Sequence, residues 1–200
     1  MRSRVLGLLL IAACEGSIAG TGDDDGAPAS DADPGGGARP DAAGGVGEPA
    51  ALAGMTLFHN EVRAAVDTQA PLPALTWSPA LAATAAAWVA QCRDVDAPTG
   101  LVDHNPGRSN GHPYYVGENI FASGGGATAK QAVQLWAGEK ANYNYTANTC
   151  NGVCGHYTQL VWRDTREVGC AVGTCPGLQY PNTIVCNYGP GGNVGGQRPY

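Results

Sequence analysis

Three stretches of the chain place apolar residues at helical spacing. A first helix is predicted over about 53–68, where apolar side chains recur every three or four residues. A second begins at Ser78 and Pro79, because serine is a favoured N-cap and proline is tolerated at the first helical position. A third is predicted from Thr128 to Tyr143, with Val133 and Trp136 on its apolar face.

Three further stretches have the pattern of strands. Residues 118–122 are predicted to form a short strand, and residues 168–172 and 183–188 alternate enough to predict two paired strands. The segment 94–116 is rich in Asp, Asn, Gly and Pro, which predicts a long loop. Helices and strands mixed in this order indicate an α+β fold.

The first residues have the pattern of an export signal. Arg2 and Arg4 precede an apolar stretch, residues 5–13, that is too short to span a bilayer. Residues 11–14 read Ile-Ala-Ala-Cys, which predicts a bacterial lipoprotein signal whose Cys14 is lipidated. The alternative is an ordinary signal peptide. Removing Cys14 leaves six cysteines, an even number that suits an exported chain and favours the lipoprotein interpretation.

Residues 15–50 consist mainly of Gly, Ala, Asp and Pro, a composition that predicts a disordered tether. This stretch holds eight of the 17 acidic residues and a single base, Arg39. The remaining domain, residues 51–200, then has nine acids and eight bases, a net charge of about −1. Because it has no basic surplus, nucleic acid is not an expected partner. Glu15 after Cys14 favours an address at the outer membrane or cell surface, with secretion as the alternative.

The most informative motif is residues 155–162, Gly-His-Tyr-Thr-Gln-Leu-Val-Trp. It sets an imidazole, a phenol, a hydroxyl and an amide side by side, a mixture that favours the wall of a polar cleft over a plain core element. Together with Gly-Glu-Asn-Ile at 117–120 and Cys-Asn-Tyr-Gly-Pro-Gly-Gly-Asn at 186–193, it resembles the CAP superfamily. The chain is most similar to the plant pathogenesis-related class one proteins.

The resemblance covers the domain almost end to end, through further motifs at 58–63, 75–81, 148–154 and 195–200. It implies an α-β-α sandwich of the CAP type. It also implies three structural disulfides, so that no thiol is assigned a catalytic role. By position, the expected pairs are Cys92 with Cys175, Cys150 with Cys154, and Cys170 with Cys186.

In this family two histidines and two acids converge in a central cleft. The matching residues are His156, Glu118 and Glu139, together with a histidine of the loop that precedes Glu118. His104 fits that position better than His112. Two imidazoles with open coordination positions predict a weak site for zinc or another divalent metal that folding does not require, with the carboxylates completing the cleft.

Other polar residues are assigned lesser roles. Tyr157, Thr158 and Gln159 are candidates for lining the cleft and contacting a ligand, and Thr158 is the only hydroxyl considered as a nucleophile. Asn119 is expected to bond backbone at its strand, and the resemblance gives His59 a structural or rim role.

These features predict an exported binding module, monomeric and tethered to the membrane only through Cys14. Its cleft would hold a metal, and its surface would bind a lipid, a sterol-like molecule or a peptide. The alternative is a metal-assisted hydrolase, a peptidase or an enzyme acting on an envelope polymer, with Glu118 or Glu139 as general base. The absence of His-Glu-x-x-His weighs against a standard zinc protease. A third hypothesis is a defence- or toxin-like protein whose loop 94–116 binds a partner.

Overall fold

The computed structural model describes residues 47–200. The signal sequence, Cys14 and most of the tether lie outside the described residues. Residues 47–50, the end of the predicted tether, are among the described residues. The Glu48 carboxylate accepts hydrogen bonds from the backbone N–H groups of Gly54 (2.9 Å) and Thr56 (2.7 Å) and so satisfies free donors at the start of the first helix.

Helices and strands alternate irregularly along the chain. The α-helices are α1 (Met55–Ala64), α2 (Pro79–Val89), α3 (Ala129–Gly138) and α4 (Gly155–Leu160), and the 3-10 turns are η1 (Ala50–Leu52) and η2 (Glu139–Asn142). The strands are β1 (Thr76–Trp77), β2 (Gly117–Ser123), β3 (Tyr143–Asn144), β4 (Thr149–Cys150), β5 (Glu167–Thr174) and β6 (Asn182–Gly189). Among the described residues, no helix is long and apolar enough to cross a membrane.

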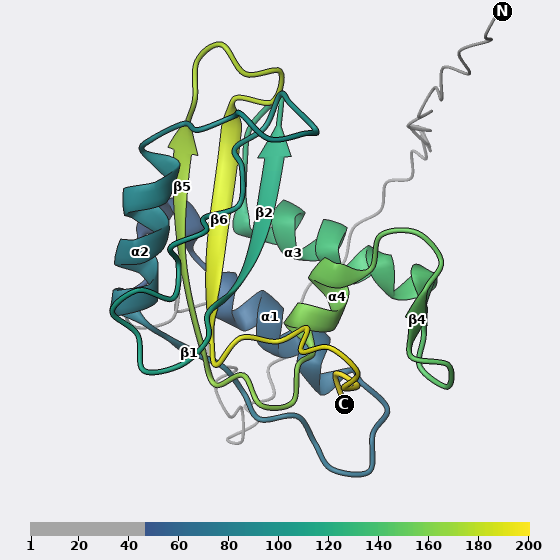
Figure 1. Ribbon diagram of the computed structural model, residues 1–200. Coiled ribbons are helices and arrows are strands. Elements are labelled where there is room, and N and C mark those ends of the chain that lie inside the picture. Colours follow the sequence, from purple (N-terminus) through teal and green to yellow (C-terminus); the bar gives the residue numbers. More distant parts are fainter. Residues whose placement is uncertain (1–46) are drawn as a thin grey trace, which may run out of the picture. The chain divides into compact units, whose positions relative to one another are not determined.

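One four-stranded sheet organises the domain, in the order β1-β5-β6-β2 (Figure 1). Strands β5, β6 and β2 are antiparallel neighbours, and the short β1 runs parallel to β5. The predicted pairing of 168–172 with 183–188 is therefore confirmed. Because β2 has a partner on one side only, it forms an edge of the sheet.

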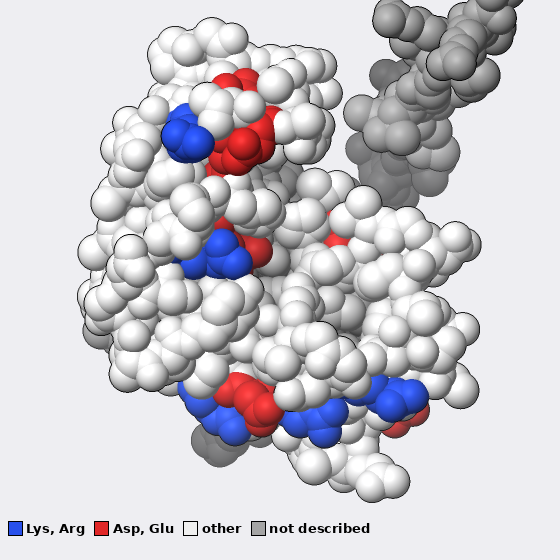
Figure 2. All heavy atoms as spheres, viewed as in Figure 1, with Lys and Arg blue, Asp and Glu red and all other residues white. Residues whose placement is uncertain are grey.

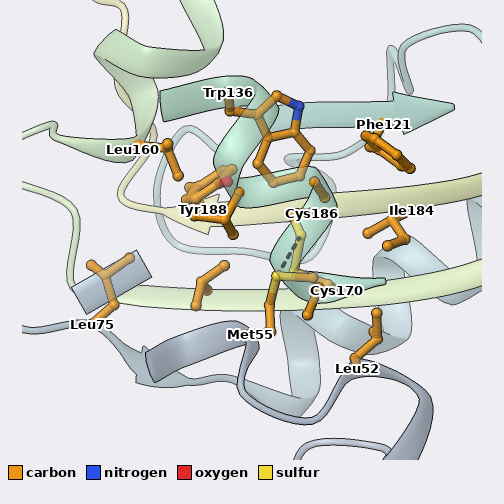
Figure 3. Packing of buried hydrophobic residues seen from close by; sticks show 14 of the residues in the cluster. Leu52, Met55, Leu75, Phe121, Trp136, Leu160, Cys170, Ile184, Cys186 and Tyr188 are labelled. Atoms are coloured by element: carbon orange, nitrogen blue, oxygen red, sulfur yellow. Dashed lines mark hydrogen bonds between the residues drawn. A yellow bond between two sulfur atoms is a disulfide. The ribbon is translucent and has the colours of Figure 1, made fainter. Parts of the chain in front are cut away.

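Each face of the sheet carries its own apolar core. On one face α2 packs through Ala85, Trp88 and Val89 against Ala171 of β5 and Val185 of β6. The other face carries the larger core, to which α1, α3 and α4 contribute and which surrounds the Cys170–Cys186 disulfide (Figure 3). Its members alternate along β5 and β6 with those of the first core, as the period of two residues in a strand requires. The α-β-α sandwich is thus confirmed.

The three disulfides form in the expected pairs. Cys92 joins Cys175, Cys150 joins Cys154, and Cys170 joins Cys186. Cys170 and Cys186 stand directly opposite each other in the β5–β6 register, so this bridge links neighbouring strands.

Two helices are shorter than their apolar patterns predict. Instead of 53–68, α1 covers Met55–Ala64; it starts later than predicted because Gly54 just before it has a left-handed backbone (φ 84°). Instead of continuing to Tyr143, α3 ends at Gly138 and passes through the 3-10 turn η2 into β3. This change of path brings the carboxylate of Glu139 to the start of α4.

Candidate functional site

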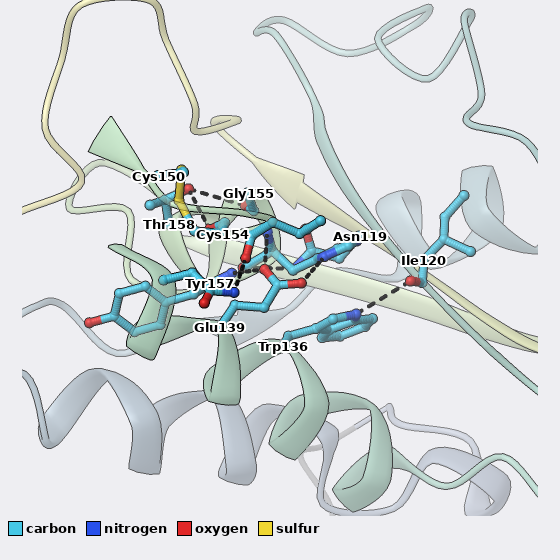
Figure 4. A network of polar contacts seen from close by, with 12 residues as sticks. Asn119, Ile120, Trp136, Glu139, Cys150, Cys154, Gly155, Tyr157 and Thr158 are labelled. Carbon is cyan, nitrogen blue, oxygen red and sulfur yellow. Dashed lines mark hydrogen bonds and ion pairs between the residues drawn. A yellow bond between two sulfur atoms is a disulfide. The ribbon is translucent and has the colours of Figure 1, made fainter. Parts of the chain in front are cut away.

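The first half of the candidate site is the pair His156 and Glu139. One carboxylate oxygen of Glu139 lies 2.6 Å from Nδ1 of His156, and the other accepts from the backbone N–H groups of His156 (3.0 Å) and Tyr157 (3.2 Å). Glu139 therefore caps the N-terminus of α4 and orients the first imidazole at once (Figure 4). The indole of Trp136, one helical turn before Glu139, stacks on the His156 ring with centroids 6.2 Å apart.

The second half is the pair His104 and Glu118. Nδ1 of His104 lies 2.7 Å from a carboxylate oxygen of Glu118, which also accepts from the Asn105 backbone N–H at 2.9 Å. The Glu118 side chain is fully buried, whereas 61% of the His104 side chain is exposed. In the orientation that satisfies both of its amide atoms, Asn187 donates to the other Glu118 oxygen at 3.2 Å. Glu118 is thus held rigidly and His104 projects from it into solvent.

Both pairs are attached to neighbouring residues of the edge strand β2. Glu118 holds His104, and the next residue, Asn119, donates its side-chain amide to the main-chain carbonyl of His156 at 3.1 Å. Successive side chains of a strand point to opposite faces, so the two pairs approach the edge of the sheet from its two sides. Figure 2 shows a hollow in the middle of this face of the molecule, with acidic atoms visible on both sides of it.

In both pairs the same ring nitrogen of the histidine contacts the carboxylate. Each imidazole gives Nδ1 to a carboxylate, which fixes the tautomer with its proton on Nδ1 and leaves Nε2 as a lone-pair donor. Neither Nε2 atom has a hydrogen-bond partner among residues 47–200. Across the same residues, no group of three or more His, Cys, Asp or Glu side chains is arranged to hold a metal ion. The arrangement therefore offers two imidazole nitrogens and leaves the other coordination positions open.

Of the two loop histidines, His104 is the one that contacts Glu118. His112 instead lies 2.9 Å from the hydroxyl of Thr84 on α2, and its ring stacks on Tyr114. The loop that carries both histidines is fastened to the domain. Tyr114 donates to a carboxylate oxygen of Glu167 at 2.9 Å, and burial together with this hydrogen bond raises the pKa of Tyr114 to about 12.

The motif at 155–162 is more buried than its polar composition suggests. Tyr157, Thr158 and Gln159 are all buried within α4. Tyr157 shares a hydrogen bond with the hydroxyl of Tyr200 (3.1 Å), and burial raises its pKa well above the usual value. Gln159 bonds the backbone of Gly192 (2.8 Å), so its amide supports the C-terminal segment.

Of Tyr157, Thr158 and Gln159, only Thr158 borders a cavity, together with Gly155 and Trp162 of the same motif. Its hydroxyl donates to Asn193 at 2.7 Å, and it lines a cavity of about 340 Å³ between α4, Tyr143 and the C-terminal segment. None of His104, Glu118, Glu139 and His156 borders this cavity. A contact of Tyr157, Thr158 or Gln159 with a ligand in the histidine cleft therefore stays a prediction.

A buried polar network supports the site from inside the core. His59 is fully buried, with Nδ1 2.7 Å from the Met55 carbonyl and Nε2 2.9 Å from the Tyr188 hydroxyl. Tyr188 in turn accepts from Asn119 at 3.1 Å. Burial lowers the pKa of His59 to about 4 and raises that of Tyr188. The spacing of these residues along the chain does not predict their connection to His156, because they lie on three separate elements, α1, β2 and β6.

Family comparison agrees with the fold and the motifs. Residues 57–188 match the family model described as CAP, the cysteine-rich secretory protein family, and the chain belongs to this family. It is 44% identical to pathogenesis-related protein 1 of Arabidopsis thaliana over 147 residues, which cover 71% of this chain and 78% of that protein. It is 39% identical to GLIPR1-like protein 1 of Bos taurus, with 72% of this chain matched but only 60% of the bovine protein.

Two solved structures extend the comparison to three dimensions. Venom allergen-like protein 4 of Schistosoma mansoni superposes with a TM-score of 0.61 at 29% identity, over 76% of this chain and 95% of that chain. The crystal structure of NaASP2 with Zn²⁺ superposes with a TM-score of 0.56 at 26% identity, over 80% of this chain and 88% of the other.

Proposed function

We propose that the protein is an exported CAP-domain binding module whose cleft holds a divalent cation through Nε2 of His104 and Nε2 of His156. The observation that carries this proposal is the shared Nδ1–carboxylate contact, at 2.7 Å in one pair and 2.6 Å in the other. Metal-bound histidines commonly give their second ring nitrogen to a carboxylate in this way, which orients the ring and raises its basicity. The Zn²⁺ in the related NaASP2 structure supports the same interpretation.

Two protein ligands make a weak and open site. Zinc prefers four ligands and accepts imidazole readily, so water or a bound molecule would complete the shell. The metal would supply positive charge to a ligand in the cleft. Glu118 and Glu139 hold the imidazoles in place rather than ligating the ion themselves, because both already bond ring and backbone N–H groups.

The same contacts favour binding over metal-assisted hydrolysis. A general base needs a carboxylate oxygen that can accept a proton from the attacking water. Both oxygens of Glu139 are occupied, and Glu118 is fully buried with an oxygen shared between His104 and Asn105. The hydrolase therefore stays the alternative, and turnover of casein or peptidoglycan that is lost in Glu118→Gln would support it.

Metal analysis and calorimetry of the oxidised protein test the cation site. We expect one equivalent of zinc, lost in the His104→Ala/His156→Ala variant and retained in His112→Ala, whose ring contacts Thr84 instead. Glu139→Gln and Glu118→Gln should each weaken zinc binding by about tenfold, because each removes the charge that orients an imidazole. Equal binding by the wild type and the double variant would refute the proposal.

Export and anchoring form a separate part of the proposal. Three disulfides suit an oxidising compartment, and the family itself is named for secretory proteins. Lipidation of Cys14 would tether the domain to the cell envelope. Mass spectrometry of the mature N-terminus checks this directly: a diacylated Cys14 supports the anchor, and an unmodified N-terminus after another residue supports an ordinary signal peptide.

A further inference from the structure

A groove of about 1020 Å³ lies apart from the histidine cleft. Four segments that are distant in sequence form its walls: residues 67–70 after α1, Tyr145 of the β3–β4 hairpin, residues 163–164 after α4, and residues 197–200 near the C-terminus. None of the two histidines and two glutamates of the cleft contributes to it. Its volume is at the upper end of the range for drug-sized ligands, so it has room for several residues of a chain molecule.

Two arginines of this groove are held in place by carbonyl oxygens. Arg163 donates to the carbonyl of Arg198 at 2.9 Å, and Arg198 donates to the carbonyls of Tyr145 (3.1 Å) and Thr146 (2.8 Å). Within residues 47–200, neither guanidinium has a carboxylate oxygen within 4.0 Å. Since a guanidinium has five N–H donors, each keeps donors available for an outside carboxylate, which it can bind through two parallel hydrogen bonds.

An aromatic pair stiffens the same wall. The rings of Tyr145 and Tyr200 stack with centroids 4.9 Å apart and planes only 8° from parallel, and the Arg198 guanidinium lies 5.7 Å from the Tyr145 centroid. Tyr200 is also anchored to the buried Tyr157 through its hydroxyl. The arginine is therefore positioned before any ligand arrives, which lowers the entropic cost of binding.

The charged side chains that line the groove limit the class of molecule that it can bind. Asp67 and Asp164 also line the groove, so its two positive and two negative side chains balance. Figure 2 shows basic and acidic atoms interleaved along the lower edge of the molecule. A uniform polyanion would be repelled by the aspartates, and a lipid tail would find few apolar walls. A peptide fits this mixed-charge, polar lining better. Its carboxylates are isolated from one another, and its backbone amides can bond the Gln69 and Gln197 side chains that also line the groove.

We propose that this groove binds an extended peptide segment that carries spaced acidic side chains, with Arg163 and Arg198 each receiving a carboxylate. The site is independent of the cation proposed for the histidine cleft. It gives the module a peptide ligand of defined charge, held on the surface formed by the β3–β4 hairpin and the C-terminal segment.

Fluorescence polarisation with labelled peptides tests the proposal on the purified, oxidised protein. The probes are short peptides in which two Glu residues are separated by one, two or three Ser or Gln residues. We expect at least one spacing to bind, with affinity reduced about tenfold by Arg163→Gln or Arg198→Gln. Replacing the peptide's Glu by Gln should abolish binding, while Lys130→Gln, on the exposed side of α3, should change nothing.

A second pair of variants controls for misfolding of the arginine variants. Asp164 and Asp67 accept no hydrogen bond from residues 47–200, so Asp164→Asn and Asp67→Asn should fold normally and tighten peptide binding about two- to threefold. The His104→Ala/His156→Ala variant should bind the peptide as well as the wild type does, which separates this result from that of the metal test. The proposal is overturned if no spacing binds, if the Gln peptides bind equally, if Asp164→Asn weakens binding, or if polyphosphate binds more tightly than every peptide.

Discussion

The side-chain amide of Asn119 reaches from the edge strand of the sheet to the main-chain carbonyl of His156, at 3.1 Å. The same nitrogen lies 3.1 Å from the hydroxyl of Tyr188, which bonds the buried ring of His59. One amide therefore connects the core to the backbone of a candidate metal ligand. Asn119 was expected to bond backbone at its own strand; the backbone that it bonds belongs instead to α4.

Removing this amide should cost stability. Asn119→Ala leaves the His156 carbonyl and the Tyr188 hydroxyl with one partner fewer in a buried setting, where each lost hydrogen bond costs about 1–3 kcal/mol. We expect the free energy of unfolding in urea to fall by about 2 kcal/mol. Gln134→Ala, at an exposed position of α3, serves as the control and should stay within about 0.5 kcal/mol of the wild type. An Asn119→Ala protein as stable as this control would contradict the network.

The buried His59 should make the protein sensitive to mild acid. Its pKa falls from 6.5 to about 4 because burial penalises the charged ring. Above pH 6.5 the ring is neutral in both the folded and the unfolded state, so its contribution to stability is complete. As the pH falls from 6.5 towards 4, only the unfolded state takes up the proton, and stability decreases by up to about 3 kcal/mol.

The measurement is urea unfolding between pH 5 and 7, compared with His59→Gln. The difference isolates His59 from the other three histidines, which are present in both proteins. We expect the wild type to lose more stability than the variant over this interval. Parallel curves would show that His59 does not stay neutral when buried.

Arg63 should prove a stronger structural residue than its charge suggests. Its side chain is 1% exposed and donates to the carbonyls of Pro73, Leu160, Trp162 and Thr165. Burial and the neighbouring Arg166 lower its pKa to about 10. Arg63→Met leaves these carbonyls without their donor, and we expect a loss of about 3 kcal/mol or more, measured by urea unfolding. Lys130→Gln, an exposed charge removal, is the matched control; equal losses in the two variants would refute this role.

Gly169 sits where α2 contacts β5 most closely. A Cβ atom there would collide with the backbone of Ser78 and Ala82 rather than with a movable side chain. Gly169→Ala should therefore push α2 away from the sheet and destabilise the fold by about 1–3 kcal/mol, as overpacking does. Gly124→Ala, which meets nothing within 4 Å, should be neutral in the same thermal or urea unfolding experiment. A neutral Gly169→Ala would mean that the helix can shift without cost.

Much of the fold followed from local pattern. The second helix could be predicted because Ser78 and Pro79 mark its start, and α2 begins at Pro79 as expected. The strands β5 and β6 could be predicted because alternation reports a two-faced sheet directly. The ends of α1 and α3 could not, because Gly54 and the Glu139 contacts act through backbone geometry and tertiary bonds that an apolar pattern does not record.

The candidate site, like the fold, was only partly predictable from the sequence. By itself, the sequence indicated the family, the three cysteine pairs that the resemblance implies and the candidate residues Glu118, Glu139 and His156, because motifs preserve residue identity and order. It favoured His104 over His112, and the contact of His104 with Glu118 is seen only in the tertiary structure. Only the tertiary structure decided that each carboxylate takes Nδ1 of its histidine and that Tyr157, Thr158 and Gln159 are buried. The arginine groove also emerged only there, since its walls run from Asp67 to Tyr200, residues 133 positions apart in the chain. Such contacts between distant residues depend on packing across the whole domain, and the spacing of residues along the sequence does not predict them.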